Sequence, residues 1–257
     1  RIAIRTRAQA DDPEPFEAVI HRTALAAARA AQPPHGKAVD ITLNTDTEHE
    51  RVTIAVVFGG QSSEHEVSCL TAAGVLGALD PSRYEVHGIG IDKRGVWHRY
   101  TVEEIGALRV EDGRLPAIGE DRPRAVMVRE PGGVRLATLE GDRLVDPVHV
   151  DVAFPVMHGA YCEDGCIQGH FEILGLRYVG CGVTSSANGM DKAFMRTCFE
   201  QAGIPLVPWL TITPGRWRDD RRGCLARVNA ELRYPVYVKP ARGGSSVGIS
   251  RVTDPAR

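Results

Sequence analysis

A loop rich in glycine and serine follows Lys239 near the end of the chain. It reads Gly243-Gly244-Ser245-Ser246-Val247-Gly248, and such residues let backbone amides approach an anion without large side chains in the way. The ammonium of Lys239 would neutralise the same anion. The order differs from G-x-x-x-x-G-K-[ST], in which the lysine follows the loop. We predict a nucleotide-phosphate site, with a flexible hairpin tip as the alternative.

Two acids, Glu64 and Glu66, lie where the first predicted strand passes into a helix, within Gly59–Ser68. This is the usual position for ligand recognition in open α/β sheets. Two carboxylates argue against a phosphate and favour a cation, such as the ammonium of an amino acid. The alternative is structural: the serines cap the helix, with Glu66 in its first turn.

Polar residues also follow a second predicted buried strand, where His158 precedes Glu163 and Asp164. We expect them at the same sheet edge as Glu64, with a purely structural histidine as the alternative. Lys192, in the helix that begins the next domain, is a further candidate, and a surface lysine is its alternative.

Potential zinc ligands recur every fourth residue in the same region. Three intervening glycines, and the strand that runs directly into the first ligand, argue against the continuous helix that would align them. A zinc site is therefore kept only as an alternative. Its ligands would be His158, Cys162, Cys166 and His170.

The elements around these residues predict an α/β fold. A continuous β-branched run from Val52 to Phe58 is typical of a buried parallel strand, and the helix and strand after it complete a βαβ unit of a doubly wound sheet. Residues 93–147 are predicted to form a hairpin-like insertion. Further strands are expected at 84–91, 150–156, 177–179, 235–239 and 249–252, and helices at 64–79, 166–174 and 185–202.

Composition excludes several classes of protein. The 257 residues are 43% hydrophobic and 25% charged, with a net charge of -2, which is ordinary for a globular protein and offers no basic footprint for nucleic acid or an anionic membrane. The apolar runs are shorter than the roughly 20 residues that span a bilayer. Six irregularly spaced cysteines indicate reduced thiols. We expect a cytoplasmic protein that binds neither nucleic acid nor membrane.

Taken in order, the segments resemble the D-alanine–D-alanine ligase family. The resemblance covers about residues 51–257 and implies an N-terminal doubly wound, pre-ATP-grasp domain followed by the first part of an α+β ATP-grasp domain. In this family ATP phosphorylates the carboxylate of one D-alanine, which is then joined to the amine of a second for peptidoglycan synthesis. The segments that carry the resemblance are Phe58–Ser68, His158-Gly159, Glu163-Asp164-Gly165, Gln168-Gly169, Met190-Asp191-Lys192 and Tyr234–Gly248.

The resemblance assigns roles to the candidate residues. Glu64 would bind the ammonium of the first D-alanine, and Ser245 would connect to it through hydrogen bonds beside the second substrate; these two are the expected catalytic residues. His158 would lie near the first carboxylate. Lys192 and Lys239 would contact the phosphates of ATP, and the loop Gly243–Gly248 would close over the γ-phosphate.

The resemblance also implies a domain plan and an assembly. We expect a leader of unknown role over residues 1–50, a substrate-positioning domain over 51–183 and an incomplete nucleotide-binding domain over 184–257. A homodimer is implied for the full-length protein. Cys162 stands where the family usually has glycine, which predicts strain if its φ is positive.

The two ends of the sequence, Arg1 and Arg257, predict a chain cut on both sides. The resemblance implies that the ligands of Mg²⁺ and the residues that select the second substrate lie beyond Arg257. The chain alone is therefore expected to be inactive. D-alanine–D-lactate ligase, D-alanine–D-serine ligase and an inert binding fragment stay open as alternatives.

Overall fold

A computed structural model describes residues 51–254 of the chain. This part forms two compact units, one ending at Val183 and the other beginning at Thr184. The predicted leader, residues 1–50, lies outside the described residues. No helix in the described part is long and apolar enough to cross a membrane.

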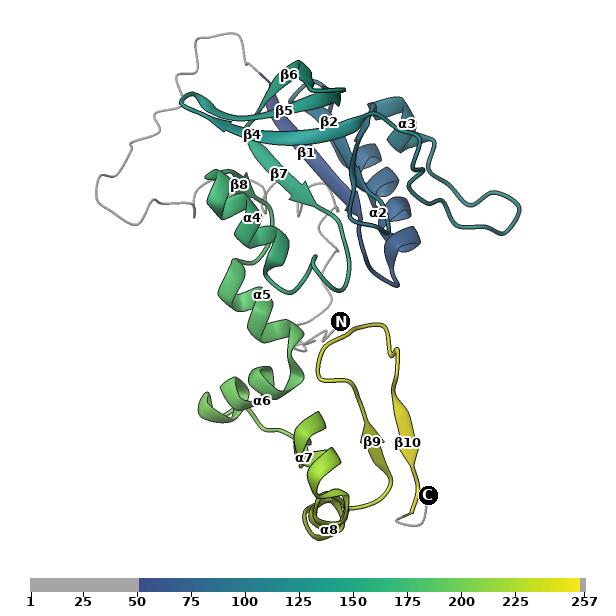
Figure 1. Ribbon diagram of the computed structural model, residues 1–257, viewed down its shortest axis with the longest axis vertical. Coiled ribbons are helices and arrows are strands. Elements are labelled where there is room, and N and C mark those ends of the chain that lie inside the picture. Colours follow the sequence, from purple (N-terminus) through teal and green to yellow (C-terminus); the bar gives the residue numbers. More distant parts are fainter. Residues whose placement is uncertain (1–50, 255–257) are drawn as a thin grey trace, which may run out of the picture. The chain divides into compact units, whose positions relative to one another are not determined.

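The first unit is built on an eight-stranded mixed sheet with the order β6-β5-β4-β3-β2-β1-β7-β8 (Figure 1). Strands β2, β1, β7 and β8 run parallel, whereas β2 to β6 pair antiparallel in succession. The predicted insertion thus extends the central sheet. The strands are β1 (Val52–Gly59), β2 (Tyr84–Ile91), β3 (Trp97–Tyr100), β4 (Arg124–Glu130), β5 (Gly133–Glu140), β6 (Arg143–Val150), β7 (Val152–Pro155) and β8 (Arg177–Tyr178).

Helices cover both faces of this sheet, because β1 is apolar on both sides. Val56 and Phe58 pack with residues of α2 (His65–Ala78) and α3 (Val102–Gly106), whereas Val57 packs in a second cluster with α4 (Cys166–Leu174). The side chains alternate with the period of two that a strand imposes. The predicted doubly wound α/β fold is confirmed, and the helix at 166–174 and the strand at 84–91 have the predicted bounds.

The strand predicted at 150–156 is wrong at its start. Val150 ends β6 and pairs with Val134, whereas Val152 begins β7 and pairs with Ile54. Asp151 separates the two strands, because its carboxylate accepts a hydrogen bond of 2.8 Å from the amide of Thr53. This contact joins residues far apart in the sequence, so no local pattern announces it.

The second unit consists of short helices and a two-stranded antiparallel sheet. The single helix predicted over 185–202 is wrong: it is interrupted at Asp191, whose backbone is extended (φ -93°, ψ 109°) and whose side chain caps the next helix by accepting from the amides of Ala193 and Phe194. Side-chain capping of this kind favours a new helix start over continuation. The elements are α5 (Val183–Met190), α6 (Lys192–Gln201), α7 (Pro214–Asp219), α8 (Arg221–Glu231), β9 (Val236–Val238) and β10 (Ser250–Val252).

Ser68 of α2 joins the ends of β1 and β7. Its hydroxyl accepts from the amide of Gly59 at 2.8 Å and donates to the carbonyl of Val156 at 3.0 Å, and its side chain has no exposed surface. Replacement by alanine leaves two buried backbone groups without this partner. We expect Ser68→Ala to lower the free energy of unfolding by about 1–3 kcal/mol, measured by urea denaturation. The exposed Ser82→Ala should cost less than about 0.5 kcal/mol, and equal effects would contradict the proposed role of Ser68.

Candidate functional site

The loops that follow β1 and β7 meet at the carboxyl end of the parallel strands. The two strands are neighbours in the sheet, so both loops leave at the same edge. A Cβ atom added to Gly159 would lie 3.3 Å from Oε2 of Glu64 and 2.6 Å from Oγ of Ser62. The carboxylate of Glu64 therefore lies against the residue that follows His158, and Gly159 leaves it the room to do so.

The structure distinguishes the two acids of the first loop. Glu66 is paired with Lys93, whose hydrogen bond is the main cause that holds the pKa of Glu66 below its usual value. Glu64 directly precedes α2 and is half-buried. Glu66 is thus engaged by a neighbouring lysine, and the carboxylate that lies against Gly159 is that of Glu64.

The alternative of serine capping is wrong for α2. The residue at the cap position is Glu64, and its side chain makes no capping hydrogen bond. Ser62 instead accepts from the amide of Glu64 at 3.1 Å. The serine therefore shapes the loop that carries the carboxylate and does not satisfy the amides of the helix.

His158 is held by a residue of α2. Its Nε2 lies 3.1 Å from Oγ1 of Thr71, and the histidine is half-buried between Met157 and Gly159, both buried. Nothing in the sequence marked Thr71 as a partner. The ring has a fixed neighbour on one side, on the helix that begins after Glu64.

The acids after His158 brace their own loop. Glu163 accepts from the amide of Gly159 at 2.9 Å, and Asp164 accepts from the amides of Tyr161 and Cys166 at 2.9 and 3.1 Å. Burial opposes ionisation of Asp164, but hydrogen bonds from these residues outweigh it and lower its pKa. The two carboxylates thus shape the loop that carries His158.

Cys162, which stands where the family usually has glycine, does not have the positive φ that would strain its backbone. The left-handed residue of this turn is Tyr161, with φ 63°, and the φ of Cys162 is not positive. Gln168 supports the turn from α4 by donating to the carbonyl of Cys162 at 2.9 Å. Burial, the largest cause, raises the pKa of the Cys162 thiol to about 12, so this sulfur is a packing group.

The zinc alternative finds no support in the arrangement of these side chains. Across residues 51–254, no three His, Cys, Asp or Glu side chains lie together in a way that would hold a metal ion. His170 packs edge-on against Trp97, with ring centroids 5.3 Å apart. The four-residue spacing thus does not produce a zinc site.

His65 supports the first loop from beneath and was not identified as functional from the sequence. Its ring is fully buried, its Nε2 accepts from the amide of Ile118 at 3.1 Å, and its Nδ1 lies 2.9 Å from the carbonyl of Gly60. Because the amide can only donate, the ring proton is on Nδ1 and points to Gly60. Gly60 has φ 101°, and a Cβ added to it would lie 2.9 Å from Met157, so the turn requires glycine at this position.

In the second unit the predicted phosphate loop is attached to the start of α6. The ammonium of Lys192 donates to the carbonyl of Gly243 at 2.7 Å, and its amide donates to the carbonyl of Ala241 at 2.9 Å. Burial and then repulsion from Lys239 lower the pKa of Lys192. The structure therefore brings both predicted lysines to the same loop.

Two serines at the tip of this loop have a left-handed backbone conformation. Ser245 and Ser246 have φ 49° and 60°, whereas Gly244 has no positive φ. At the base, Gly248 has φ 72°, and an added Cβ would lie 2.9 Å from the ring of Pro240. The loop is mostly exposed, and it favours glycine at both ends, since Gly243 also has a positive φ of 132°.

Asp191 ties the loop to the helix through Arg242, in an ion pair of 3.1 Å. Burial opposes ionisation of Asp191, but the hydrogen bond from Arg242 and the amides of Ala193 and Phe194 lower its pKa. A depressed pKa stabilises the fold at neutral pH, and this stabilisation is lost as the pH falls through the folded-state value.

The same pair gives a prediction for Asp191→Asn, which keeps an oxygen for the cap and removes the charge. We expect a loss of about 0.5–1 kcal/mol at pH 7, since Arg242 is largely exposed. The loss should vanish in acid, where Asp191 is protonated in the unmodified protein too. Urea denaturation at several pH values measures it, and a loss that persists below the folded-state pKa would contradict the ion pair as its cause.

The predicted residues thus fall into two groups. Glu64 and His158 belong to the first unit, and Lys192, Lys239 and Gly243–Gly248 belong to the second. The predicted hydrogen-bond link from Glu64 to Ser245 joins residues of different units and stays a prediction.

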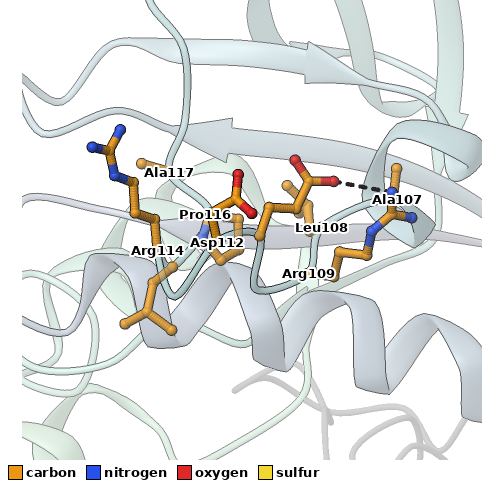
Figure 2. A pocket seen from close by; sticks show the side chains of 9 residues that line it. Ala107, Leu108, Arg109, Asp112, Arg114, Pro116 and Ala117 are labelled. Atoms are coloured by element: carbon orange, nitrogen blue, oxygen red, sulfur yellow. Dashed lines mark ion pairs between the residues drawn. The ribbon is translucent and has the colours of Figure 1, made fainter.

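A hollow on the surface of the first unit is unrelated to these groups. Its lining comes from a single stretch, residues 107–117 (Figure 2). Within this stretch Arg109 and Glu111 form an ion pair of 3.0 Å. None of the candidate residues lines it. It is the inside of one surface loop, and it contributes nothing to the site.

Comparison with known proteins identifies the family. The family described as D-ala D-ala ligase N-terminus matches residues 53–181, and that described as D-ala D-ala ligase C-terminus matches residues 198–256. A D-alanine–D-alanine ligase of Kocuria rhizophila is 41% identical over 220 residues, which cover 84% of this chain and 57% of the relative. One from Kineococcus radiotolerans is 45% identical over 204 residues, covering 78% and 54%. The chain spans about half the length of these relatives.

Solved structures of the same kind share the fold. The D-alanine–D-alanine ligase of Coxiella burnetii has a TM-score of 0.66 at 30% identity, and VanG D-Ala:D-Ser ligase of Enterococcus faecalis has 0.63 at 31%; each match covers 80% of this chain and 56% of the solved chain. The first family match alone takes in half of the sequence, over the strands and loops that bring Glu64 and Gly159 together. The chain belongs to the D-alanine–D-alanine ligase family.

Proposed function

We propose that this chain supplies the first amino-acid site and part of the ATP site of an enzyme that joins two D-alanine molecules through an acyl-phosphate. The first unit would position the amino acid, and the second would bind the nucleotide. The observation that carries the proposal is the carboxylate of Glu64 held against Gly159, beside a histidine fixed by Thr71. Family membership supports the reaction, since the curated relatives are D-alanine–D-alanine ligases.

The charges of this pair of loops suit a zwitterion. A carboxylate attracts the ammonium of an amino acid, and an imidazole ring can donate to its carboxylate. Near a protein surface, opposite charges 4 Å apart attract by about 4 kcal/mol before desolvation is subtracted. Glu64 would thus bind the ammonium, and His158 would orient the carboxylate that is to be phosphorylated.

The residues of the second unit fit a nucleotide phosphate. Lys192 and Lys239 repel each other, and an anion between them would relieve that repulsion. Gly243–Gly248 offers backbone amides without large side chains except Val247. Bound ATP would supply the phosphoryl group that activates the carboxylate. In this proposal the two lysines neutralise the charge of the phosphates, and Ser245 connects to Glu64. Phosphoryl transfer then requires only charge neutralisation and alignment from the protein, so no protein nucleophile is needed.

Assembly and location complete the proposal. The family resemblance implies that the full-length protein is a homodimer in the cytoplasm, and sedimentation of the full-length protein tests the dimer. Mg²⁺ is expected with ATP, but no role for it is assigned to residues 51–254, which hold no group of three suitable side chains.

A chimera tests the reaction directly. Residues 51–257 would be joined to the second half of the Kocuria rhizophila relative, starting where its match to this chain ends. We expect phosphate release from ATP that depends on D-alanine, with D-alanyl-D-alanine detected by mass spectrometry and no response to L-alanine. A folded chimera that binds ATP and D-alanine but releases no phosphate would contradict the proposal.

A further inference from the structure

A polar stripe that begins at the cap residue of α2 and continues along the helix lies beside the loop that carries His158. Glu64 lies against Gly159, Ser68 donates to the carbonyl of Val156, and Thr71 contacts His158. These three residues are spaced i, i+4 and i+7, which places them on one face of a helix. One rigid element therefore sets the positions of both groups proposed to meet the amino acid.

The hydrogen bonds of Thr71 bear on which nitrogen of His158 carries a proton. The Thr71 hydroxyl donates to the carbonyl of Val67 at 2.9 Å, and a hydroxyl has only one proton to give. Its contact of 3.1 Å with Nε2 of His158 is then a hydrogen bond only if Nε2 donates. This leaves Nδ1 as the nitrogen that can face a ligand.

We propose that Thr71 is a positioning residue, which holds His158 as the Nε2-H tautomer and presents Nδ1 to the carboxylate of the bound amino acid. The part played by the carboxylate rests on the proposed function, whereas the tautomer does not. The bond to Thr71 is compatible with a charged ring too, because Nε2 carries a proton in both forms. Nδ1 donates to a carboxylate only in the charged form of the ring, and Thr71 accepts from Nε2 in that form as well.

Three variants separate this role from simple support of the helix. Thr71→Ser keeps the hydroxyl, and Thr71→Val keeps the shape but loses both hydrogen bonds. Thr197 is a matched control, since its hydroxyl donates to the carbonyl of Ala193 at 3.0 Å in the same helical manner. Thr197→Val therefore reports the effect of losing the bond to the helix alone.

Nitrogen-15 spectra of the histidine rings in the full 257-residue chain are the primary test, with the His158 signals assigned by their loss in His158→Gln. We expect the Nε2-H tautomer in the unmodified chain, in Thr71→Ser and in Thr197→Val, and a mixture of tautomers in Thr71→Val. An Nδ1-H ring in the unmodified chain would overturn the proposal, as would an unchanged ring in Thr71→Val. If Thr71→Val does not fold, the spectra of the unmodified chain and of Thr71→Ser still show whether His158 is the Nε2-H tautomer.

Binding of D-alanine to the same proteins, measured by calorimetry, gives the second readout. Loss of one orienting hydrogen bond should weaken binding about 5- to 10-fold in Thr71→Val, with Thr71→Ser and Thr197→Val within about twofold of the unmodified chain. Full affinity in Thr71→Val would show that the tautomer has no part in recognition. If the unmodified chain binds no D-alanine while the ring is Nε2-H, the proposed function fails and the assignment of the tautomer stands.

Discussion

Glu64→Gln should weaken the binding of D-alanine to this chain about 100-fold. Glutamine keeps the size of the side chain and its contact with Gly159, but it removes the charge that the ammonium would meet. A hydrogen bond between charged groups contributes about 1.5–3 kcal/mol, and about 2.7 kcal/mol corresponds to 100-fold in affinity. Calorimetric titration with D-alanine measures the change.

Glu66→Gln is the matched control for this experiment. The two acids are two residues apart, but Glu66 is paired with Lys93, so its replacement should leave the affinity within about twofold. Equal losses in the two variants would mean that only the overall charge of the loop matters. Full affinity in Glu64→Gln would remove Glu64 from the site.

Much of the first unit follows from local pattern. From Ile54 to Phe58 the strand is apolar and buried at every position because α2 and α4 cover opposite faces of β1, and this makes a buried parallel strand recognisable. Glu64 is predicted as a site residue for a related reason, because side chains just beyond such a strand lie at the edge where ligands bind. Its exact partner, Gly159, belongs to a distant segment and becomes evident only in the fold.

Other features depend on contacts that no local pattern contains. Thr71 and His158 are 87 residues apart, and Asp151 and Thr53 are 98 apart. A threonine within a helix has an ordinary structural use, so nothing distinguishes Thr71 until the loop after β7 lies beside it. The division between β6 and β7 was missed for the same reason.

The break between α5 and α6 was missed although its signal is local. Asp191 can cap the helix that follows it, but the apolar spacing runs on through Phe194 and favours one continuous helix. Capping is satisfied here together with the ion pair to Arg242. The second interaction adds to the preference for a break, and it comes from a loop that lies 51 residues later.

Lys192→Met and Lys239→Met should each reduce ATP affinity by about 30- to 100-fold, by the same range of energies for a charged hydrogen bond. Lys192 should be the more sensitive position, because its ammonium also donates to Gly243 and helps hold the loop. Lys93→Met is the control, since Lys93 is paired with Glu66 in the first unit. Fluorescence titration with ATP measures the affinities.

The double variant tests whether the two lysines share one anion. The free protein carries their mutual repulsion, which contributes to the lowered pKa of Lys192, and removing either charge relieves it. The combined loss should therefore differ from the sum of the two single losses. Strict additivity would indicate two separate sites.

The pH dependence of ATP binding follows from the same geometry, with its sign fixed by linkage. A bound polyphosphate favours the charged ammonium and raises the pKa of Lys192 above its lowered value in the free protein. Affinity should then be highest below the free-state pKa and should fall as the pH rises through it. This fall should be smaller in Lys192→Met, which has no proton to lose at that position. An equally steep fall in that variant would assign the titration to another group and remove Lys192 from the phosphate site.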